Sequence, residues 1–461
     1  MLNLNEDIKR IYLIGIGGIG VSAIAEILLN SDYIISGSDL KRTFNTQKLE
    51  QLGATIYYQQ DGAHINETID LVVYSSAISP ENPEYKKAVE LNIPMLNRAE
   101  MLGNIMASYK ESIAVSGAHG KTTTTSMLSL MLDHAMLQPT IMIGGNVKEF
   151  NGNAKVSEGD ILITEACEYK DNFLHFKPTT SIVLNIDEDH LDYFEDLDQI
   201  VDSFTKFIKL LPANGKAIIN IDDFDAKKLL PHVEANLLTF GITQDADYMA
   251  KNIVFSEDGT SKFDVYLRDE FLFRCSLSIP GTHNIYNSLA AITGAHAIGV
   301  STEVMQSTLK GFSGADRRFQ HKGSFKEATV IDDYAHHPTE IKATLSAAKK
   351  LTHNRITCIF QPHTYTRTEE LLHEFSTSFK DADLTIITDI YAAREVDSGR
   401  IHSKDLANLI KKEGQAVKYL ATFEEIVAFL KDYTEPGDII FTMGAGNIYQ
   451  VGEIITESNS L

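Results

Sequence analysis

The stretch ESIAVSGAHGKTTTTSML, residues 111–128, runs from an apolar segment through a glycine turn into a segment free of proline. A strand that enters such a turn and leaves it as a helix is the arrangement of a nucleotide-binding P-loop. Its backbone N–H groups and the positive end of the helix face phosphate oxygens, and Lys121 adds a charge. Gly117 stands three residues before Gly120, whereas the usual spacing would place a glycine at Val115. The stretch therefore predicts a variant P-loop, and its alternative is a chance Gly-Lys-Thr at a strand–helix turn.

A second glycine loop, GIGGIG at residues 15–20, fits the dinucleotide pattern G-x-G-x-x-G. Asp39 follows Gly20 by nineteen residues, where an acid that binds a ribose is expected. Taken alone, this loop indicates an NAD-dependent dehydrogenase. The same geometry suits any nucleotide diphosphate, so the chain is expected to hold two different nucleotides.

The organisation of the chain predicts an α/β protein of three domains. A length of 461 residues suits about three domains at roughly 100 to 200 residues each. Strands alternate with helices in residues 1–107 and again in residues 315–461, which predicts two Rossmann-like parallel sheets. Residues 108–314 hold the P-loop and further strands of a parallel sheet, and residues 248–281 read as an antiparallel β-ribbon within it.

The composition of the chain indicates which partners and which compartment to expect. The net charge is −22, and no run of Lys and Arg is long enough to follow a phosphate backbone, so nucleic acid is not expected as a partner. Cys167, Cys275 and Cys358 lie far apart without metal-site spacing, which suits a reducing compartment. No apolar run reaches membrane-spanning length, and the N-terminus does not resemble a signal peptide. The protein is expected in the cytoplasm, without membrane insertion.

Acidic side chains follow two strands downstream of the P-loop. Glu165 lies near the end of the segment ILITEA. The loop after another apolar segment contains Asp187, Glu188, Asp189, His190 and Asp192. Such loops are often only solvated turns, but two of them in the sheet that carries a P-loop predict a Mg²⁺ site.

Seven motifs, in this order and spacing, resemble the Mur ligases: GAHGKTT, EACE, NIDEDHLD, HNIYN, GADRRFQ, DDYAHHPTE and FQPHTYTRT. The resemblance extends from Gly15 to about Gly446 and implies a three-domain, ATP-dependent enzyme of peptidoglycan synthesis. Within the family, the sequence is most similar to the enzymes that join L-alanine to UDP-N-acetylmuramate. The implied reaction phosphorylates the muramoyl carboxylate, and the amine of L-alanine then attacks the acyl phosphate. The first glycine loop then belongs to the UDP-sugar.

The resemblance also implies roles for individual residues. It implies ATP contacts at Gly117, His119, Gly120, Lys121, Thr122, Thr123, Asn284, Asn287, Arg318 and Asp333. It implies UDP-sugar contacts at Gly15, Gly17, Gly18, Gly20, Asp39, Ser75, Ser76 and Ala77. It implies ligands for Mg²⁺ or Mn²⁺ at Thr122, Glu165 and His190, and amino-acid contacts at Tyr334 and His336. It implies catalytic roles for Lys121, His337 and Arg367.

Simpler roles stay open for some of these residues. Asn284 could cap a helix, and His336-His337-Pro338 could be a helix start, since proline suits the first helical position. Cys167 stands where the family pattern often has Asp, which favours Glu165 over Glu168 as the metal ligand.

Three other functions remain as alternatives. They are a recycling ligase that attaches a preformed tripeptide to the same UDP-sugar, a non-catalytic P-loop ATPase, and the dehydrogenase. If ATP ligands are split between the second and third domains, the C-terminal domain is expected to close on ATP and the amino acid.

Overall fold

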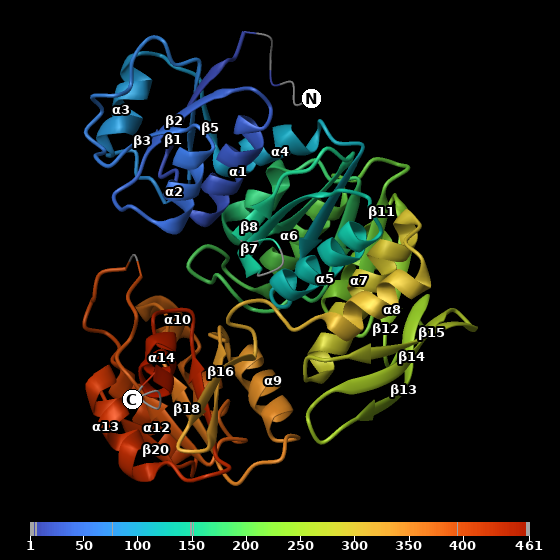
Figure 1. Cartoon of the computed structure of the whole chain (residues 1–461), viewed down its shortest axis with the longest axis vertical. Coiled ribbons are helices and arrows are strands. Elements are labelled where there is room, and N and C mark those ends of the chain that lie inside the picture. The colour runs from blue at the N-terminus through green and yellow to red at the C-terminus, as the bar shows by residue number, and fades with distance from the viewer. Residues whose placement is uncertain are drawn as a thin grey trace. The chain divides into compact units, whose positions relative to one another are not determined.

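The structure is a computed structural model of the chain, and it describes residues 4, 7–75, 77–147, 150, 152–393 and 395–457 (Figure 1). The chain divides into two compact units. The first unit comprises Met1–Ile186, Ile200–Phe240 and Ala290–Val304. The second unit comprises Asp187–Gln199, Gly241–Leu289 and Met305–Leu461. The domain boundaries expected after residues 107 and 314 stay a prediction.

The N-terminal sheet is parallel throughout, in the order β3-β2-β1-β4-β5. Its strands are β1 (Arg10–Ile14), β2 (Ile34–Ser38), β3 (Thr55–Tyr57), β4 (Leu71–Tyr74) and β5 (Met95–Asn97). Its helices are α1 (Ile19–Leu29), α2 (Phe44–Gln51), α3 (Pro83–Glu90) and α4 (Arg98–Met106). The strand order reverses between β1 and β4, and ligands bind beyond the carboxyl ends of strands at such a point. The first glycine loop follows β1 and Ser75 follows β4, so both predicted substrate loops lie at this position.

The central sheet has the order β12-β11-β10-β6-β9-β7-β8 in its first-unit part, parallel except for the β7–β8 pair. Its strands are β6 (Glu111–Ser116), β7 (Thr140–Val147), β8 (Gly152–Lys155), β9 (Ile161–Ala166), β10 (Thr180–Val183), β11 (Lys216–Asn220) and β12 (Asn236–Gly241). Strands β6, β9 and β10 are neighbours, so the loops that follow them gather at one edge of the sheet.

Helices and a ribbon accompany the central sheet. The helices are α5 (Lys121–His134), η2 (Tyr169–His175), α6 (Leu197–Ile208), η3 (Ala226–His232), α7 (Thr282–Ile298) and α8 (Thr302–Gly311). The antiparallel strands are β13 (Tyr248–Phe255), β14 (Ser261–Leu267) and β15 (Glu270–Leu277). The predicted ribbon is thus confirmed.

The C-terminal sheet has the order β16-β17-β21-β18-β19-β20, with only the β16–β17 pair antiparallel. Its strands are β16 (Gln320–Phe325), β17 (Ala328–Asp333), β18 (Ile356–Phe360), β19 (Leu384–Ile387), β20 (Val417–Tyr419) and β21 (Ile439–Met443). Its helices are α9 (Pro338–Ala348), α10 (Tyr365–Glu370), α11 (Leu372–Ser376), α12 (Ser403–Lys412), α13 (Phe423–Tyr433) and α14 (Tyr449–Glu457). The predicted α/β fold class, with Rossmann-like sheets at both ends, is confirmed.

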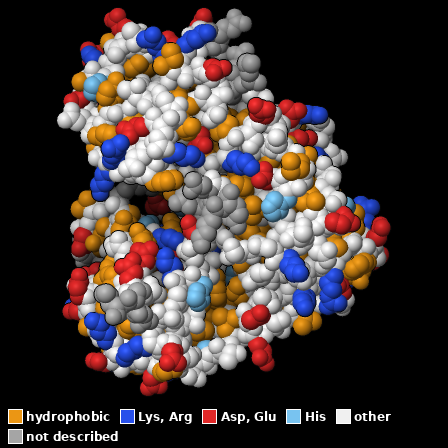
Figure 2. All heavy atoms as spheres, viewed as in Figure 1, with side chains coloured by type: hydrophobic (Ala, Val, Ile, Leu, Met, Phe, Trp, Pro, Cys, Tyr) orange, Lys and Arg blue, Asp and Glu red, His pale blue; other side chains and the backbone are white. Residues whose placement is uncertain are grey.

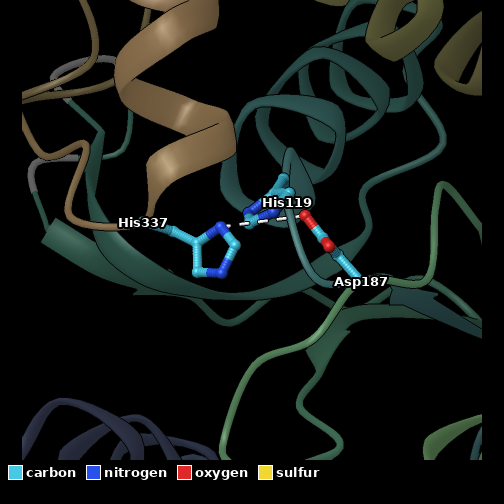
Figure 3. A group of neighbouring side chains, drawn as sticks. All are labelled: His119, Asp187 and His337. Atoms are coloured by element: carbon cyan, nitrogen blue, oxygen red, sulfur yellow. Dashed lines mark ion pairs between the residues drawn. The ribbon is translucent and has the colours of Figure 1, made fainter. Parts of the chain in front are cut away.

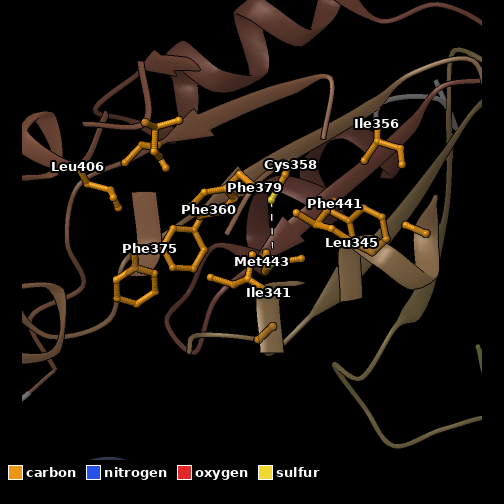
Figure 4. Close-up of a cluster of buried hydrophobic side chains, with 14 of the residues drawn as sticks. Ile341, Leu345, Ile356, Cys358, Phe360, Phe375, Phe379, Leu406, Phe441 and Met443 are labelled. Carbon is orange, nitrogen blue, oxygen red and sulfur yellow. Dashed lines mark hydrogen bonds between the residues drawn. The ribbon is translucent and has the colours of Figure 1, made fainter. Parts of the chain in front are cut away.

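Buried aromatic side chains hold the helices against the C-terminal sheet (Figure 4). Phe360 and Phe441 from the strands pack with Phe375 and Phe379, and all four are fully buried. Full burial of such a side chain stabilises the fold by about 1.5–3 kcal/mol. This core fixes β17 and β18, whose carboxyl ends lead into the loops that carry the predicted site residues.

No helix in the described part of the chain is long and apolar enough to cross a membrane. On the face in Figure 2, acidic and basic side chains are interspersed rather than gathered by sign. Cys167, Cys275 and Cys358 are all free thiols.

Candidate functional site

The P-loop requires glycine at two positions. Gly117 has φ 138° and Gly120 has φ 86°, and both angles lie in the region that favours glycine. A Cβ on Gly117 would also lie 3.0 Å from Cβ of Leu184 and 3.1 Å from the nitrogen of Asn185. Gly120 directly precedes α5, so the loop delivers its N–H groups to the start of that helix. The variant spacing therefore still builds a phosphate-binding turn.

Asn185, which the sequence analysis did not single out, holds the middle of the P-loop. Its Oδ1 accepts a hydrogen bond from the backbone N–H of His119 at 2.8 Å, and its Nδ2 donates to the carbonyl of His119 at 3.0 Å. The backbone N–H of Ala118 donates to the carbonyl of Asn185 at 3.2 Å. Because β10 lies beside β6, the loop after β10 fixes the loop after β6.

Lys121 lies within its own loop and beside a buried carboxylate. Its ammonium donates to the carbonyls of Gly117 and Ala118, and it pairs with Oε2 of Glu168 at 3.2 Å. Glu168 is 2% exposed, so the pair is largely shielded from water. Glu168, set aside in favour of Glu165 as the metal ligand, thus neutralises the P-loop lysine.

Glu165 and Thr122 offer oxygen atoms at the start of α5. Glu165 is the second-to-last residue of β9, and its Oε1 accepts a hydrogen bond from the N–H of Gly144 at 2.7 Å. A Cβ on Gly144 would meet Glu165 Oε2 at 3.0 Å, and one on Gly145 would lie 3.6 Å from Cγ2 of Thr122. Gly144 therefore lies against the carboxylate of Glu165, and Gly145 lies against the methyl group of Thr122. Hard oxygen donors of this kind fit a small divalent cation such as Mg²⁺ or Mn²⁺. Thr123, the next P-loop residue, is buried in α5.

The first glycine loop is closed by hydrogen bonds. Asp39 Oδ2 accepts from the N–H of Gly17 at 2.9 Å, and the N–H of Gly18 donates to the carbonyl of Gly15. A Cβ on Gly17 would lie 2.8 Å from Asp39 Oδ2, so this carboxylate reaches the loop because residue 17 is glycine. Asp39 thereby supports the loop itself.

The loop after β4 forms a short turn. Ser75 Oγ accepts a hydrogen bond from the N–H of Ala77 at 3.2 Å. Ser76, which the sequence analysis also assigned to the UDP-sugar, lies outside the described residues.

In the second unit, Arg367 and Asp189 form a buried ion pair. Arg367 Nη2 donates to Asp189 Oδ1 at 2.8 Å. Burial alone would raise the pKa of Asp189, but Arg367, His190 and His336 together outweigh it and hold the pKa well below its usual range. Arg367 Nη1 also lies 3.3 Å from Nδ1 of His363, which can only accept from a guanidinium. His363 is a second side chain that the sequence analysis did not identify.

His190 and His336 also interact electrostatically with Asp189. His190 Nε2 lies 3.8 Å from Asp189 Oδ2. Nδ1 of His336 lies 3.0 Å from the carbonyl of Tyr334 and 3.2 Å from Oε2 of Glu340. Burial lowers the pKa of His336 to about 3, so its ring is neutral near pH 7.

Two arginines flank Tyr334. The guanidinium carbons of Arg317 and Arg318 lie 5.0 and 5.1 Å from its ring centroid. Arg317 is anchored by Asp332 at 3.0 Å and by the carbonyls of Gly444 and Gly446. Arg317 therefore supports the loop that precedes β16, whereas Arg318 is bound to Glu340 at 3.4 Å.

Asp333 is buried at the carboxyl end of β17. It accepts hydrogen bonds from the N–H groups of Phe319 and Ala335, each at 2.8 Å. Burial raises its pKa to about 6, although Arg318 opposes the shift. Asp333 and Arg318, both predicted nucleotide contacts, are thus electrostatic neighbours within one unit.

His337 is the N-cap of α9, and Pro338 is the first helical residue. Its Nδ1 accepts from the N–H of Thr339 at 3.4 Å, and its Nε2 lies 2.9 Å from the carbonyl of Glu188. Figure 3 shows this ring with Asp187, whose Oδ2 lies 3.7 Å from Nδ1. His119, drawn with them, belongs to the P-loop of the first unit. The helix-start role considered for the His-His-Pro motif is therefore present.

Asn284 lies in the first turn of α7 and is not its N-cap, because the helix begins at Thr282. Its Nδ2 donates to the carbonyl of Pro280 at 2.7 Å, and its Oδ1 accepts from Nδ2 of Asn287 at 3.0 Å. The two predicted adenine contacts are thus joined to each other.

Three family models match the chain in succession: "Mur ligase family, catalytic domain" at residues 10–110, "Mur ligase middle domain" at 115–295 and "Mur ligase, glutamate ligase domain" at 317–446. The chain is 49% identical to a UDP-N-acetylmuramate–L-alanine ligase of Caldanaerobacter subterraneus, over 98% of both chains. It is 48% identical to the ligase of the same name from Clostridium novyi, over 99% of both chains.

Solved structures show the same likeness. The UDP-N-acetylmuramate-alanine ligase of Thermotoga maritima matches with a TM-score of 0.82 at 26% identity, over 98% of this chain and 99% of that one. A murein peptide ligase of Psychrobacter arcticus matches with a TM-score of 0.72 at 26% identity, over 98% of both chains. By these matches along its length, the chain belongs to the Mur ligase family.

Proposed function

We propose that this protein is an ATP-dependent ligase that joins L-alanine to UDP-N-acetylmuramate in the synthesis of peptidoglycan precursors. The observation that carries the proposal is the presence of two nucleotide loops, each at the carboxyl edge of its own parallel sheet. The P-loop contains Lys121, whereas the first glycine loop contains no lysine and its neighbouring carboxylate, Asp39, is bound to the loop backbone, so only the P-loop suits a phosphoryl donor. An enzyme that uses these cytoplasmic nucleotides is expected to act in the cytoplasm.

The P-loop is assigned to the phosphates of ATP. Gly117 and Gly120 offer backbone N–H groups, His119 is a further proposed contact between them, and Lys121 offers a charge for the terminal phosphates. Thr122 and Thr123 follow at the start of α5, and Thr122, Glu165 and His190 are the proposed ligands of Mg²⁺ or Mn²⁺. The ion would neutralise phosphate charge and orient the terminal phosphate. The remaining proposed nucleotide contacts are Asn284, Asn287, Arg318 and Asp333.

The first loop is assigned to the UDP-sugar. Its proposed contacts are Gly15, Gly17, Gly18, Gly20, Asp39, Ser75, Ser76 and Ala77. Closing of the C-terminal domain on nucleotide stays a prediction, which small-angle X-ray scattering tests through the radius of gyration with and without ligands.

The chemistry follows from the poor reactivity of a carboxylate. An oxygen of the muramoyl carboxylate attacks the terminal phosphorus of ATP, which releases ADP and leaves an acyl phosphate. The amine of L-alanine then attacks the carbonyl carbon, and the tetrahedral intermediate collapses to the amide and phosphate. Lys121 and Arg367 are proposed to offset charge on the transferring phosphoryl group.

The amino acid is assigned to the C-terminal domain. Tyr334 and His336 are its proposed contacts, and His337 is the proposed catalytic histidine. The Nδ1 of His337 caps α9, so a proton taken up there would break the cap. Replacement of His337 by Asn, which keeps an acceptor at the cap, separates the two roles.

The tripeptide recycling ligase is the second candidate, because the murein peptide ligase structure also matches over nearly the whole chain. The experiment is ADP release by purified protein with ATP, Mg²⁺ and UDP-N-acetylmuramate, with L-alanine in one arm and the preformed tripeptide in the other. We expect turnover with L-alanine. ADP release with the tripeptide alone would reassign the protein to recycling, and NADH turnover without amino-acid-dependent ADP release would refute the ligase proposal.

A further inference from the structure

Arg98 lies against the first turn of α1, although it belongs to another helix. It is the first residue of α4. A Cβ on Gly20 would lie 2.9 Å from Cδ of Arg98 and 3.1 Å from its Nη1. The arginine side chain therefore runs beside the end of the first glycine loop, and it fits there because residue 20 has no side chain.

Among the described residues, the guanidinium of Arg98 has no counter-ion. Within the described ranges, no ion pair or hydrogen bond involves this side chain, whereas Arg317, Arg355 and Arg367 each contact a carboxylate. Burial lowers the pKa of Arg98. Cys167 is a titratable side chain that acts on Arg98, but burial raises the pKa of its thiol to about 11, so near pH 7 the thiol is neutral and supplies no negative charge. A half-buried cation without an anion is unfavourable unless a ligand supplies one.

The N–H groups at the start of α1, beside Arg98, have no side-chain cap among the described residues. Gly18 is the N-cap and contributes no side chain, and the first turn holds no acidic residue. The N–H groups of Gly17 and Gly18 are used inside the loop. Those of Ile19 and Gly20 have no acceptor among the residues that the structure covers. Within the part of the chain that the structure describes, these two N–H donors and the guanidinium beside Gly20 thus have no anionic partner.

We propose that Arg98 binds the diphosphate of the UDP-sugar, together with the N–H groups of Ile19 and Gly20. The inference rests on the proposed function, because that function places the UDP-sugar at the first glycine loop. A diphosphate offers several oxygens to a planar fork of donors, and the helix start favours the same charge. The substrate has a second anionic group, the muramoyl carboxylate, and the helix N–H groups beside Arg98 favour the diphosphate over it.

The test compares two ligands by isothermal titration calorimetry. UDP-N-acetylmuramate has both anionic groups, whereas UDP-N-acetylglucosamine has the diphosphate without the carboxylate. Arg98→Met keeps the packing against Gly20 and removes the charge. We expect this replacement to lower the affinity for both ligands about 10- to 100-fold, the range for the loss of a hydrogen bond to a charged group. Arg10→Met is the matched control, since Arg10 is exposed at the opposite, amino end of β1, and it should leave both affinities unchanged.

Two further measurements keep the outcome decisive. ATP affinity should be unchanged in Arg98→Met, because the P-loop does not use this residue. The dependence of UDP-sugar affinity on NaCl should become shallower in Arg98→Met, and Arg98→Lys should restore part of it. Equal affinities or equal salt dependence in wild type and Arg98→Met would overturn the inference, as would a loss confined to UDP-N-acetylmuramate. If the wild-type protein bound neither UDP-sugar, the proposed function itself would fail.

Discussion

Replacement of Asn185 by Ala should weaken ATP binding, although Asn185 is not itself assigned to ATP. The amide of Asn185 makes two hydrogen bonds to the backbone of His119, one as acceptor and one as donor. Alanine removes both, while the backbone bond from Ala118 N–H to the carbonyl of residue 185 persists. The loop then loses its support on one side and samples other conformations.

The magnitude follows from the two bonds. A neutral hydrogen bond contributes about 0.5–1.5 kcal/mol, so the folded loop loses about 1–3 kcal/mol. If that loss acts fully on the population of the binding-competent loop, the Kd for ATP rises about 5- to 150-fold. Asn185→Asp should be at least as harmful, because it keeps the acceptor but points a carboxylate at the carbonyl of His119.

The assay is titration of ATP and of UDP-N-acetylmuramate into wild type and both variants. The Kd for the UDP-sugar should not change, since its loop belongs to another sheet. Asn236→Ala is the control, because it removes one side-chain hydrogen bond to Gly215 at the amino end of β12. An unchanged ATP Kd in Asn185→Ala would refute the view that this amide shapes the P-loop.

Three other predictions concern named side chains. Lys121→Ala should abolish turnover and leave UDP-sugar binding intact. It should also lower the melting temperature, because Glu168 is left buried and unpaired. The double variant Lys121→Ala/Glu168→Gln should recover the melting temperature but not turnover. Gly117→Ala should cost on the order of 1–3 kcal/mol of unfolding free energy, because φ 138° is strained for alanine, and urea titration that shows no loss would contradict this. His336 has a lowered pKa of about 3 against an ordinary value near 6.5, so the unfolded chain takes up its proton first and stability is lost as pH falls below about 6.5. Between pH 7.5 and 5 the wild type should lose about 2 kcal/mol more unfolding free energy than His336→Gln, as measured by urea titration at both pH values.

The longer strands and the loops that follow them can be predicted, because short runs of apolar residues and glycines in the sequence indicate them. Strands β1 and β6 are apolar runs that end in glycine turns, and the helices that follow lack proline. Strands β3, β5 and β20 have three residues each, none of them fully buried, so no local pattern in the sequence predicts them. Nothing in such a segment differs locally from a loop, and only pairing with a neighbouring strand defines it.

The side chains that support the site were harder to predict than those assigned to it. Asn185 stands in a polar loop, and its role depends on β10 lying beside β6. Arg98 opens an ordinary helix, and its position against Gly20 appears only after two helices pack. Glu168 has no pattern that distinguishes a metal ligand from the partner of Lys121. Long-range packing decides each of these cases, and one sequence holds no local signal for it.

The central claim is that the muramoyl carboxylate is activated by phosphorylation, and the path of its oxygen tests this directly. UDP-N-acetylmuramate labelled with ¹⁸O in the carboxylate is incubated with ATP, Mg²⁺, L-alanine and the protein, and the phosphate released is analysed by mass spectrometry. An acyl phosphate transfers one labelled oxygen to each phosphate, so the account predicts ¹⁸O in the phosphate and one labelled oxygen retained in the amide. Phosphate without ¹⁸O, formed together with the amide, would contradict it.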